Sequence, residues 1–339
     1  MALQYIEAMR PAIENELQQT IARVLGGDQV GLREMLAYHL GWIGTDAGPE
    51  AQGKRIRPLL VLLCSLAAGK AGARWQDSLP AAAGIELIHN FSLIHDDIQD
   101  QSQLRRGRPT VWVKWGVPQA INAGDLMFTI AHLAVLGVSS TKTPQITLDA
   151  SCLLHQACVD LTRGQYLDLA YENEKTIPLE AYWPMIAGKT AALLACCTEM
   201  GALLAGSPPE QRKAFRQFGY SLGLAFQVLD DWLGIWGDTE LTGKSAENDL
   251  VSGKKTLPVL YGISQNREFA RRWISGSIQL HEVNRLAKVL VDEGAQAYTN
   301  AMADQLTSEA LVALDSACDR NEAAGALYEL ANQLLKRDK

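Results

Sequence analysis

The amino-acid sequence predicts an all-α protein, and three observations support that class. Apolar residues recur at i, i+3, i+4 and i+7 through nearly every segment, which is the period of an amphipathic helix. The alternating Val, Ile and Thr patterns that form strands are absent. The 339 residues are 47% hydrophobic with 12 prolines, so long helices can bury a large core. Because no linker-like stretch divides the chain, we expect residues 1–339 to form one domain, a bundle of roughly ten or more helices.

The helix boundaries follow from capping patterns and apolar periodicity. Ser207, Pro208, Pro209 and Glu210 have the capping-box pattern with proline in the first turn, so a helix is expected from there to about residue 236. Another is expected from about 80 to 100. Two stretches rich in glycine and charge, 44–54 and 237–253, are expected to be loops. The remaining predicted helices cover about 3–24, 30–43, 55–69, 118–136, 145–172, 179–202, 255–275, 280–293 and 308–336.

Composition excludes several classes of protein. A net charge of -7 argues against a general nucleic-acid binder, which needs a basic surface. The longest apolar runs, 58–69 and 126–137, are about half the ~20 residues of a membrane-spanning helix, so no transmembrane segment is expected. The N-terminal segment is amphipathic and carries acidic residues, unlike a secretory signal. The six cysteines show no CxxC spacing, which favours a cytoplasmic protein with buried, reduced thiols.

Cys152, His155 and Cys158 recur every three residues and could share one face of a helix. That spacing raises the alternative of a zinc site. No second pair of ligands accompanies them in the sequence. Core cysteines beside a hydrogen-bonded histidine are therefore the favoured interpretation.

The segment LIHDDIQD ends an otherwise apolar helix with Asp96, Asp97 and Asp100. Asp96 and Asp100 are four residues apart and lie on one face, where like charges repel unless a cation lies between them. A hard divalent ion such as Mg²⁺, shared with a phosphate, satisfies that arrangement. A lone cluster of this kind is more often a solvated helix end, so it is weak evidence by itself.

A second apolar helix, LGLAFQVLDDWLGIWGD, also ends in acid, with Asp230, Asp231 and Asp238. Two such helices could face each other across one cavity. Gly234 stands where a further aspartate would complete a second DDxxD motif. The departure removes one possible ligand and leaves the details of the second metal shell open.

Basic residues accompany both acidic clusters. The segment GKRIRP places Lys54, Arg55 and Arg57 at a loop-to-helix junction, where free backbone N–H groups and the helix dipole also favour an anion. Together the cations are what two diphosphates would require. The other basic or polar candidates are Arg105, Arg106, Arg108, Lys189, Thr190, Lys244, Lys254 and Lys255.

At these residues the sequence resembles the trans-prenyl diphosphate synthase family, which includes farnesyl and geranylgeranyl diphosphate synthases. The resemblance runs from about residue 53 to 262. It implies the isoprenoid synthase fold, a helical bundle around a central cavity, and a homodimer. The motifs that carry it, in order, are GKRIRP, ELIHNFSLIHDDIQD, LRRGRPT, GQYLDL, GKT, FQVLDDWLGIWGD and GKKTLP.

The resemblance also implies roles for individual residues, with Mg²⁺, expected as three ions, bridging the allylic diphosphate to the protein. The implied metal-site residues are Asp96, Asp100 and Asp230, supported by Asp97 and Asp231. The implied partners of the allylic diphosphate are Arg105, Lys189 and Lys244, with Lys254 nearby. The implied metal-free site for isopentenyl diphosphate is Gly53, Lys54, Arg57, His89 and Arg106. The residues implied to face the developing allylic cation are Thr190, Gln165 and Gln227, with Asp168 ordering the pocket.

The family's reaction ionises the allylic C–O bond, after which the alkene of isopentenyl diphosphate attacks and a proton is lost. No protein nucleophile is needed, in agreement with the absence of a Ser/His/Asp or Cys/His pattern in the sequence. A class I terpene cyclase is an alternative, although it has no use for a second diphosphate site. A non-catalytic partner subunit is another, although it need not retain both acidic clusters.

Product length is implied by residues just before the first acidic cluster. Phe91 lies five residues before Asp96, about 7.5 Å along the helix axis. With a small neighbour at Ser92 and no insertion inside DDIQD, the resemblance implies geranylgeranyl diphosphate (C20) as the main product. Farnesyl diphosphate and products of C25 or longer are the alternatives. Ile88 could add to the floor of the cavity, whereas Phe91 could instead only pack between helices.

Overall fold

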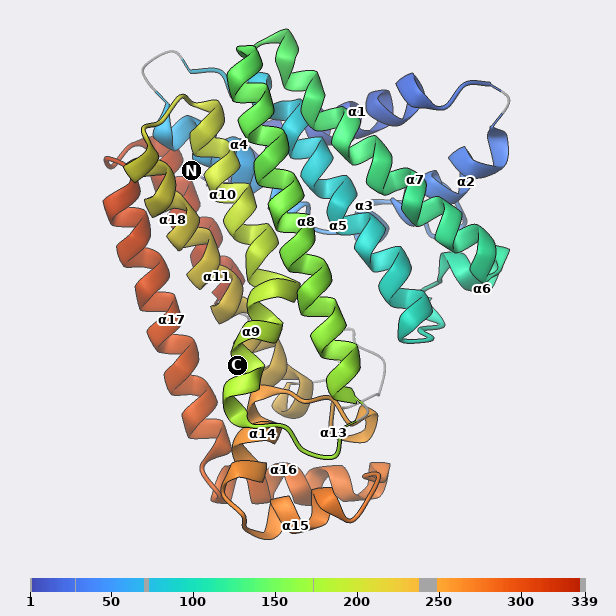
Figure 1. The fold of residues 1–339 in the computed structure, drawn as a ribbon, viewed down its shortest axis with the longest axis vertical. Coiled ribbons are helices and arrows are strands. Elements are labelled where there is room, and N and C mark those ends of the chain that lie inside the picture. The colour runs from blue at the N-terminus through green and yellow to red at the C-terminus, as the bar shows by residue number, and fades with distance from the viewer. Residues whose placement is uncertain (1, 28, 70–72, 173, 238–248, 336–339) are drawn as a thin grey trace. The chain divides into compact units, whose positions relative to one another are not determined.

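The computed structural model of the chain describes residues 2–27, 29–69, 73–172, 174–237 and 249–335. Its helices confirm the predicted all-α class (Figure 1). The chain groups into two compact units. The first contains residues 1–156, 196–215 and 317–327, and the second contains residues 157–195, 216–316 and 328–339. The single domain expected from the sequence stays a prediction.

The first unit is built mainly from the N-terminal helices, and it also takes in parts of α8, α10, α11 and α18. Its own elements, in chain order, are α1 (Ala2–Val24), α2 (Val30–His39), α3 (Pro49–Gln52), α4 (Ile56–Ala68), η1 (Trp75–Ser78), α5 (Leu79–Gln99), β1 (Leu104–Arg105), β2 (Arg108–Pro109), α6 (Val111–Trp115), α7 (Val117–Leu136) and η2 (Gly137–Ser140).

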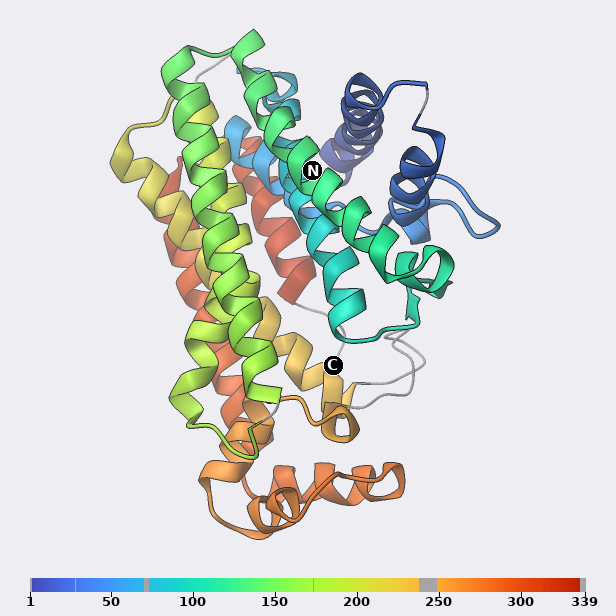
Figure 2. The same ribbon diagram turned by 45° about the vertical axis from the view of Figure 1, so that its right-hand side comes forward.

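The core of this unit positions the first acidic cluster. Every residue of α4 from Leu59 to Ser65 is buried, because the helix is apolar around its whole circumference. Helix α5 packs along α7 (Figure 2). The two helices approach closely at Gly84, where a Cβ would lie 2.6 Å from Cγ2 of Val135. This packing holds α5 in place, and its last turn carries the aspartates.

A short hairpin follows α5 and corrects the expectation that the chain has no strands. Strands β1 and β2 pair antiparallel, with Arg105 opposite Arg108. Arg106 and Gly107 form the two-residue turn, and both have positive φ, 52° and 73°. Positive φ at both central residues is the geometry that matches the twist of paired strands, so a ladder of only two residues can form.

The second unit contains the remaining helices, and its core includes Tyr182, Leu257, Phe269 and Leu286. The helices with residues in both units include α8 (Pro144–Glu172), α10 (Ala192–Leu204) and α11 (Pro209–Trp236). The other elements are η3 (Leu179–Ala181), α9 (Tyr182–Ile186), the π-turn η4 (Ala187–Ala191), α13 (Asp249–Ser252), α14 (Leu257–Ser264), α15 (Glu268–Ile274), η5 (Leu280–Glu282), α16 (Val283–Asp292), α17 (Ala295–Ala317) and α18 (Glu322–Leu335).

Two predicted helices are each interrupted. The expected helix over 255–275 is divided into α14 and α15, because Asn266 adopts a left-handed φ of 54° that ends the first helix. The expected helix over 308–336 is divided into α17 and α18. Oδ1 of Asn321 accepts a 2.8 Å hydrogen bond from the backbone N–H of Ala324, so Asn321 caps a new helix.

Smaller local predictions were also wrong. The hydroxyl of Ser207 is buried without a hydrogen-bond partner, so the predicted capping box does not form; α11 begins at Pro209, and the carbonyl of Pro208 accepts from the N–H of Arg212. The expected loops at 44–54 and 237–253 contain the short helices α3 and α13. Both helices are a single turn, which apolar periodicity is too coarse to detect.

The two longest apolar runs, 58–69 and 126–137, lie in α4 and α7, whose bounds agree with the predicted helices at 55–69 and 118–136 to within two residues. Residues 117–140 and 179–204 are long and apolar enough to cross a membrane by length and composition alone, but 78% of the apolar window in the second lies buried inside the protein, as in a core helix. The six cysteines are free thiols. Four are buried as expected, whereas Cys152 is exposed and Cys318 is partly exposed.

Candidate active site

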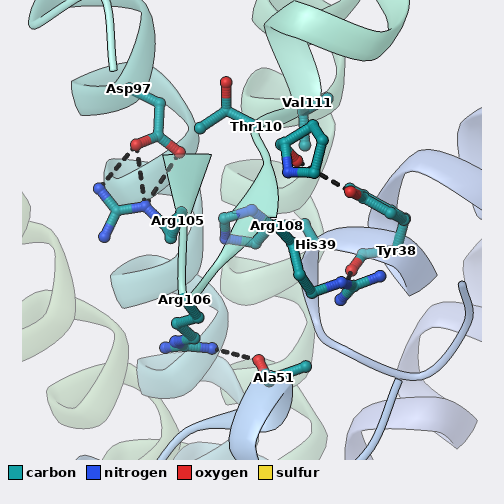
Figure 3. Close-up of a pocket in the computed structure, with 10 residues that line it drawn as sticks. Tyr38, His39, Ala51, Asp97, Arg105, Arg106, Arg108, Thr110 and Val111 are labelled. Atoms are coloured by element: carbon teal, nitrogen blue, oxygen red, sulfur yellow. Dashed lines mark hydrogen bonds and ion pairs between the residues drawn. The ribbon is translucent and has the colours of Figure 1, made fainter. Parts of the chain in front are cut away.

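The first acidic cluster occupies the last turn of α5. Asp96 is half-buried and Asp100 is exposed, while Asp97 points the other way and is 1% exposed. Both carboxylate oxygens of Asp97 accept hydrogen bonds from Nε of Arg105, each 2.9 Å long (Figure 3). Burial raises the pKa of Asp97 above its ordinary value although Arg105 opposes the change. Asp97 and Arg105 therefore pair with each other, and Asp96 and Asp100 are the more accessible carboxylates.

The basic motif GKRIRP forms the turn that leads into α4. Gly53 has a φ of 80°, and the guanidinium of Arg106 lies against it, since a Cβ on Gly53 would lie 2.8 Å from Cζ of Arg106. Nη1 of Arg106 donates a 2.7 Å hydrogen bond to the carbonyl of Ala51. The side chain of Lys54 is exposed beside them. Segments far apart in the sequence thus place two of the predicted cations together.

Arg57 and His89 complete this basic region. Nε of Arg57 is buried and has no hydrogen-bond partner among the described residues. Burial lowers the pKa of Arg57, although Cys197 and Glu86 oppose the change. Burial, and then Arg57 and Arg106, lower the pKa of His89 well below its ordinary value. The structure therefore brings Arg57, His89 and Arg106 into one electropositive region with an unused hydrogen-bond donor, as an anion site requires.

A small pocket lies beside the hairpin in the first unit (Figure 3). Its lining includes a residue that the sequence did not single out, His39 of α2. Nε2 of His39 is buried without a partner, and burial followed by the arginines lowers the pKa of His39 well below its ordinary value. The lining residues are Tyr38, His39, Ala51, Asp97, Arg105, Arg106, Arg108, Pro109, Thr110 and Val111.

Arg108 shows a structural role in this pocket. Its guanidinium donates to the carbonyls of Tyr38 at 3.0 Å and Ile43 at 2.6 Å. It also lies 4.1 Å above the ring of Tyr38. These contacts hold the hairpin against α2, so Arg108 is one of the basic candidates that the structure assigns to the scaffold.

The second acidic cluster lies near the end of α11. Asp231 is buried and accepts hydrogen bonds from the hydroxyl of Tyr182 at 2.6 Å, Nε2 of Gln227 at 2.9 Å and the backbone N–H of Leu257 at 3.0 Å. Burial raises the pKa of Asp231 to about 7 although these hydrogen bonds lower it. Asp231 thus joins α11 to α9 and α14, and the half-buried Asp230 is the more accessible of the pair. Tyr182, which no motif indicated, is the main support of this arrangement.

The other predicted polar residues of the second unit also lie close together. The hydroxyl of Thr190 donates a 2.7 Å hydrogen bond to Oε1 of Gln227, and Lys189 forms an ion pair with Asp168. Lys189 and Thr190 belong to the π-turn η4, a local irregularity that is frequent at functional sites.

Two motif glycines allow the close approach of α8 and η4 that brings these side chains together. A Cβ on Gly164 would lie 2.8 Å from Cα of Gly188, so neither residue can be larger without displacing the backbone. Gln165 is half-buried on the same stretch of α8, beside Gly164. Lys254 is exposed after α13, and Lys244 lies outside the described residues.

Gly234 has an unexpected neighbour. A Cβ at this position would lie 2.6 Å from Cγ of Asp249, the first residue of α13. The carboxylate of Asp249 therefore occupies the space into which an aspartate at position 234 would extend. The sequence did not indicate that the side chain of Asp249 fills this space, because Asp249 lies in a different helix.

Phe91 packs edge-to-face against Phe128 of α7, with ring centroids 4.9 Å apart. Phe128 in turn lies 4.4 Å from the ring of His132. Ser92 donates a 2.8 Å hydrogen bond to the carbonyl of His89, and Ile88 is fully buried. Phe91 thus lies between the rings of His95 on α5 and Phe128 on α7.

The oxygen donors of the two acidic clusters fit a hard divalent ion. Among the described residues, no group of three or more His, Cys, Asp or Glu side chains is arranged to hold a metal by itself. Mg²⁺ commonly binds to one or two carboxylates and completes its octahedral shell with substrate phosphates and water. Asp96 and Asp100 on α5, and Asp230 on α11, each offer carboxylate oxygens of the kind that such an ion binds.

The protein is thus helical, with accessible carboxylates near the ends of α5 and α11 and an arginine-rich region beside the hairpin. Residues 45–290 match the family described as polyprenyl synthetase, and the chain belongs to that family. It is a prenyltransferase with the isoprenoid synthase fold.

Individual relatives support this assignment. The chain is 38% identical over 316 residues to a farnesyl diphosphate synthase of Mycobacterium tuberculosis, covering 90% of this chain and 86% of that one. It is 37% identical over 310 residues to a geranylgeranyl diphosphate synthase of the same organism, covering 86% and 87%. The crystal structure of a polyprenyl synthetase from Streptomyces coelicolor is similar with a TM-score of 0.88 and 31% identity, covering 99% of this chain and 100% of that one.

Proposed function

We propose that this protein is a short-chain trans-prenyl diphosphate synthase that condenses isopentenyl diphosphate with an allylic diphosphate. The observation that carries the proposal is the buried, unpartnered Nε of Arg57, next to His89 and Arg106. This second anion site lacks the metal-binding carboxylates of the acidic clusters. A terpene cyclase, which ionises one diphosphate only, has no use for it, and the retained aspartates and cations argue against a non-catalytic subunit.

Each group of residues has its own task in that reaction. Magnesium bound at Asp96, Asp100 and Asp230, three ions in the proposed complex, would neutralise the charge of the departing allylic diphosphate. Lys54, Arg57 and Arg106 bind and orient isopentenyl diphosphate so that its alkene faces the allylic carbon.

Side chains of the second unit support the developing cation. The hydrogen-bonded pair of Thr190 and Gln227 presents fixed oxygen dipoles to positive charge. Tyr182, through Asp231, keeps Gln227 in that orientation. The alkene attacks the allylic cation, which forms a new C–C bond and leaves a tertiary cation. That cation loses a proton from the neighbouring carbon to the departed diphosphate, and a new double bond forms.

The proposed main product is geranylgeranyl diphosphate, with farnesyl diphosphate as the alternative. The contact between Phe91 and Phe128 supports a rigid aromatic stop before the first acidic cluster. Relatives of similar identity are named for both products, so the family alone does not choose between them. Incubation of the protein with each allylic primer, followed by measurement of product chain length, tests the choice.

The protein is further proposed to be a cytoplasmic homodimer. Four apolar side chains of α7 are 40–48% exposed, and such a face favours a second copy of the chain. They are Val117, Ile121, Leu133 and Leu136. Light scattering on the purified protein measures the oligomeric state, and a monomer would contradict the proposal.

The condensation itself is tested by assaying Mg²⁺-dependent turnover of an allylic diphosphate with and without isopentenyl diphosphate. A longer prenyl diphosphate that forms only when both substrates are present is the expected result. Lys54→Ala and Arg57→Ala should weaken isopentenyl diphosphate binding while leaving ionisation of the allylic substrate less affected. Cyclic or hydrolysed products that form without isopentenyl diphosphate would support the terpene cyclase instead.

A further inference from the structure

Arg55 lies in the middle of the basic motif, yet it points away from the anion site. It is the N-cap residue of α4 and adopts a left-handed conformation, with φ 51° and ψ 38°. Residues other than glycine rarely adopt that conformation, and it persists only where surrounding contacts hold it. Its two neighbours in the motif, Lys54 and Arg57, are the cations of the proposed isopentenyl diphosphate site.

The contacts that hold Arg55 come from three other helices. Its side chain is 0% exposed, and its Nε donates to Oε1 of Glu14 on α1 at 2.6 Å. Nη1 donates to Oε1 of Glu86 on α5 at 2.9 Å. Nη2 donates to Oε2 of Glu14 at 3.3 Å and to the carbonyl of Leu40, just after α2, at 3.2 Å. The guanidinium therefore ties the turn before α4 to α1, α2 and α5 at once.

The two carboxylates are themselves fixed. Nδ2 of Asn90 donates to Oε1 of Glu86 at 3.0 Å, and Nε1 of Trp42 donates to Oε2 of Glu14 at 2.7 Å. Burial disfavours the charge of Arg55, but Glu86 and Glu14 outweigh it and raise the pKa of Arg55. The cluster of Arg55, Glu14 and Glu86 is thus a preformed, hydrogen-bonded support and not part of the anion site.

A further contact connects this support to the turn itself. Nη2 of Arg10, also on α1, donates to the carbonyl of Lys54 at 3.2 Å. The turn is therefore held from α1 through both its backbone and the side chain of Arg55. Asn90 and Glu86 also lie on α5, the helix that carries His89, so the support and the anion site share one rigid element.

We propose that Arg55, held by Glu14 and Glu86, is a positioning residue that fixes Lys54 and Arg57 for the diphosphate bound without metal. The inference rests on the proposed condensation for the identity of that substrate. The geometry of the turn, however, concerns only the binding of a diphosphate. The positioning role of Arg55 and the proposed condensation can therefore be tested separately.

The test compares Glu86→Gln, Glu86→Ala and Glu14→Gln with wild type. We expect Glu86→Ala to raise KM for isopentenyl diphosphate about tenfold or more, with kcat and KM for the allylic substrate nearly unchanged. Glu86→Gln retains an oxygen that can accept from Arg55 and should restore most of the affinity. Glu14→Gln should lose more affinity than Glu86→Gln, because both oxygens of Glu14 accept hydrogen bonds, from Arg55 and Trp42, and the amide leaves only one oxygen to accept them.

Two further variants separate conformation from contact. Arg55→Gly suits the left-handed backbone but removes the guanidinium, and it should lose affinity as Glu86→Ala does. Leu17→Ala on α1 is the matched control, because it removes a fully buried side chain of the same helix as Glu14 without touching the turn. It should lower the melting temperature and leave KM unchanged.

Binding of inorganic diphosphate in the presence of EDTA, followed by calorimetry, gives a readout without catalysis. The expected order of affinity is wild type and Leu17→Ala above Glu86→Gln, and Glu86→Gln above Glu86→Ala and Arg55→Gly. Equal affinity in all five proteins would overturn the positioning role. If the affinities for diphosphate follow this order but wild type forms no condensation product, the proposed function fails while the positioning role stands.

Discussion

The most specific prediction concerns Gly234 on α11. In Gly234→Asp the new Cβ would lie 2.6 Å from Cγ of Asp249, well inside van der Waals contact. The Asp249 carboxylate is the end of a flexible side chain, so it can rotate away while the backbone stays in place. The variant nevertheless places two negative charges where the structure holds one.

The expected cost has a steric part and an electrostatic part. Overpacking a filled site costs about 1–3 kcal/mol. Two carboxylates about 4 Å apart repel by about 4 kcal/mol at an effective dielectric constant of about 20, before either side chain rotates. Allowing for rotation, we expect a loss of about 3 kcal/mol. Over 339 residues, an unfolding entropy of about 2.1 cal/mol/K per residue converts this loss into a Tm decrease of about 4 °C.

Scanning calorimetry in EDTA measures this decrease. Gly234→Ala, which adds the Cβ without the charge, should show only the steric part. Gly234→Asp/Asp249→Gly removes the neighbour and should recover most of the loss. Magnesium with inorganic diphosphate should also narrow the difference, because a cation between the two carboxylates removes their repulsion. An unchanged Tm for Gly234→Asp, or no recovery in the double variant, would refute the reasoning.

Three other predictions follow from the site. Asp96→Ala and Asp230→Ala should each lower turnover at saturating Mg²⁺ by about 10³-fold, or about 4 kcal/mol, because each removes a proposed metal ligand. Near-normal rates would contradict that role for these residues. Phe91→Ala should shift the product from C20 to C25 or longer by opening the aromatic stop, and an unchanged product length from a folded variant would place the stop elsewhere. Because the pKa values of His39 and His89 lie below the ordinary 6.5, the unfolded chain binds more protons below that pH, so the free energy of unfolding should fall as pH decreases through 6.5. His39→Asn and His89→Gln should flatten this slope in urea titrations, and slopes equal to wild type would contradict the assignment.

The sequence by itself determined the fold class and the place of each charged motif along the chain. Helix α8 was expected at 145–172 and extends over Pro144–Glu172, because apolar periodicity is a local property of the chain. The motifs GKRIRP and LIHDDIQD are contiguous, so the chemistry of Arg57 and the spacing of Asp96 and Asp100 can be recognised without coordinates. The breaks before α15 and α18 depend on Asn266 and Asn321. Apolar periodicity is a property of a whole segment and does not detect the effect of a single residue.

Only the tertiary structure decided which partner each charged side chain takes. Arg105, expected at the allylic diphosphate, pairs with Asp97, and Asp231, expected to support the metal site, accepts a hydrogen bond from Tyr182. Asp249, next to Gly234, belongs to another helix. A hydrogen bond forms over about 3 Å between groups whose separation along the chain is unrestricted, so partner choice depends on how helices pack and not on sequence spacing.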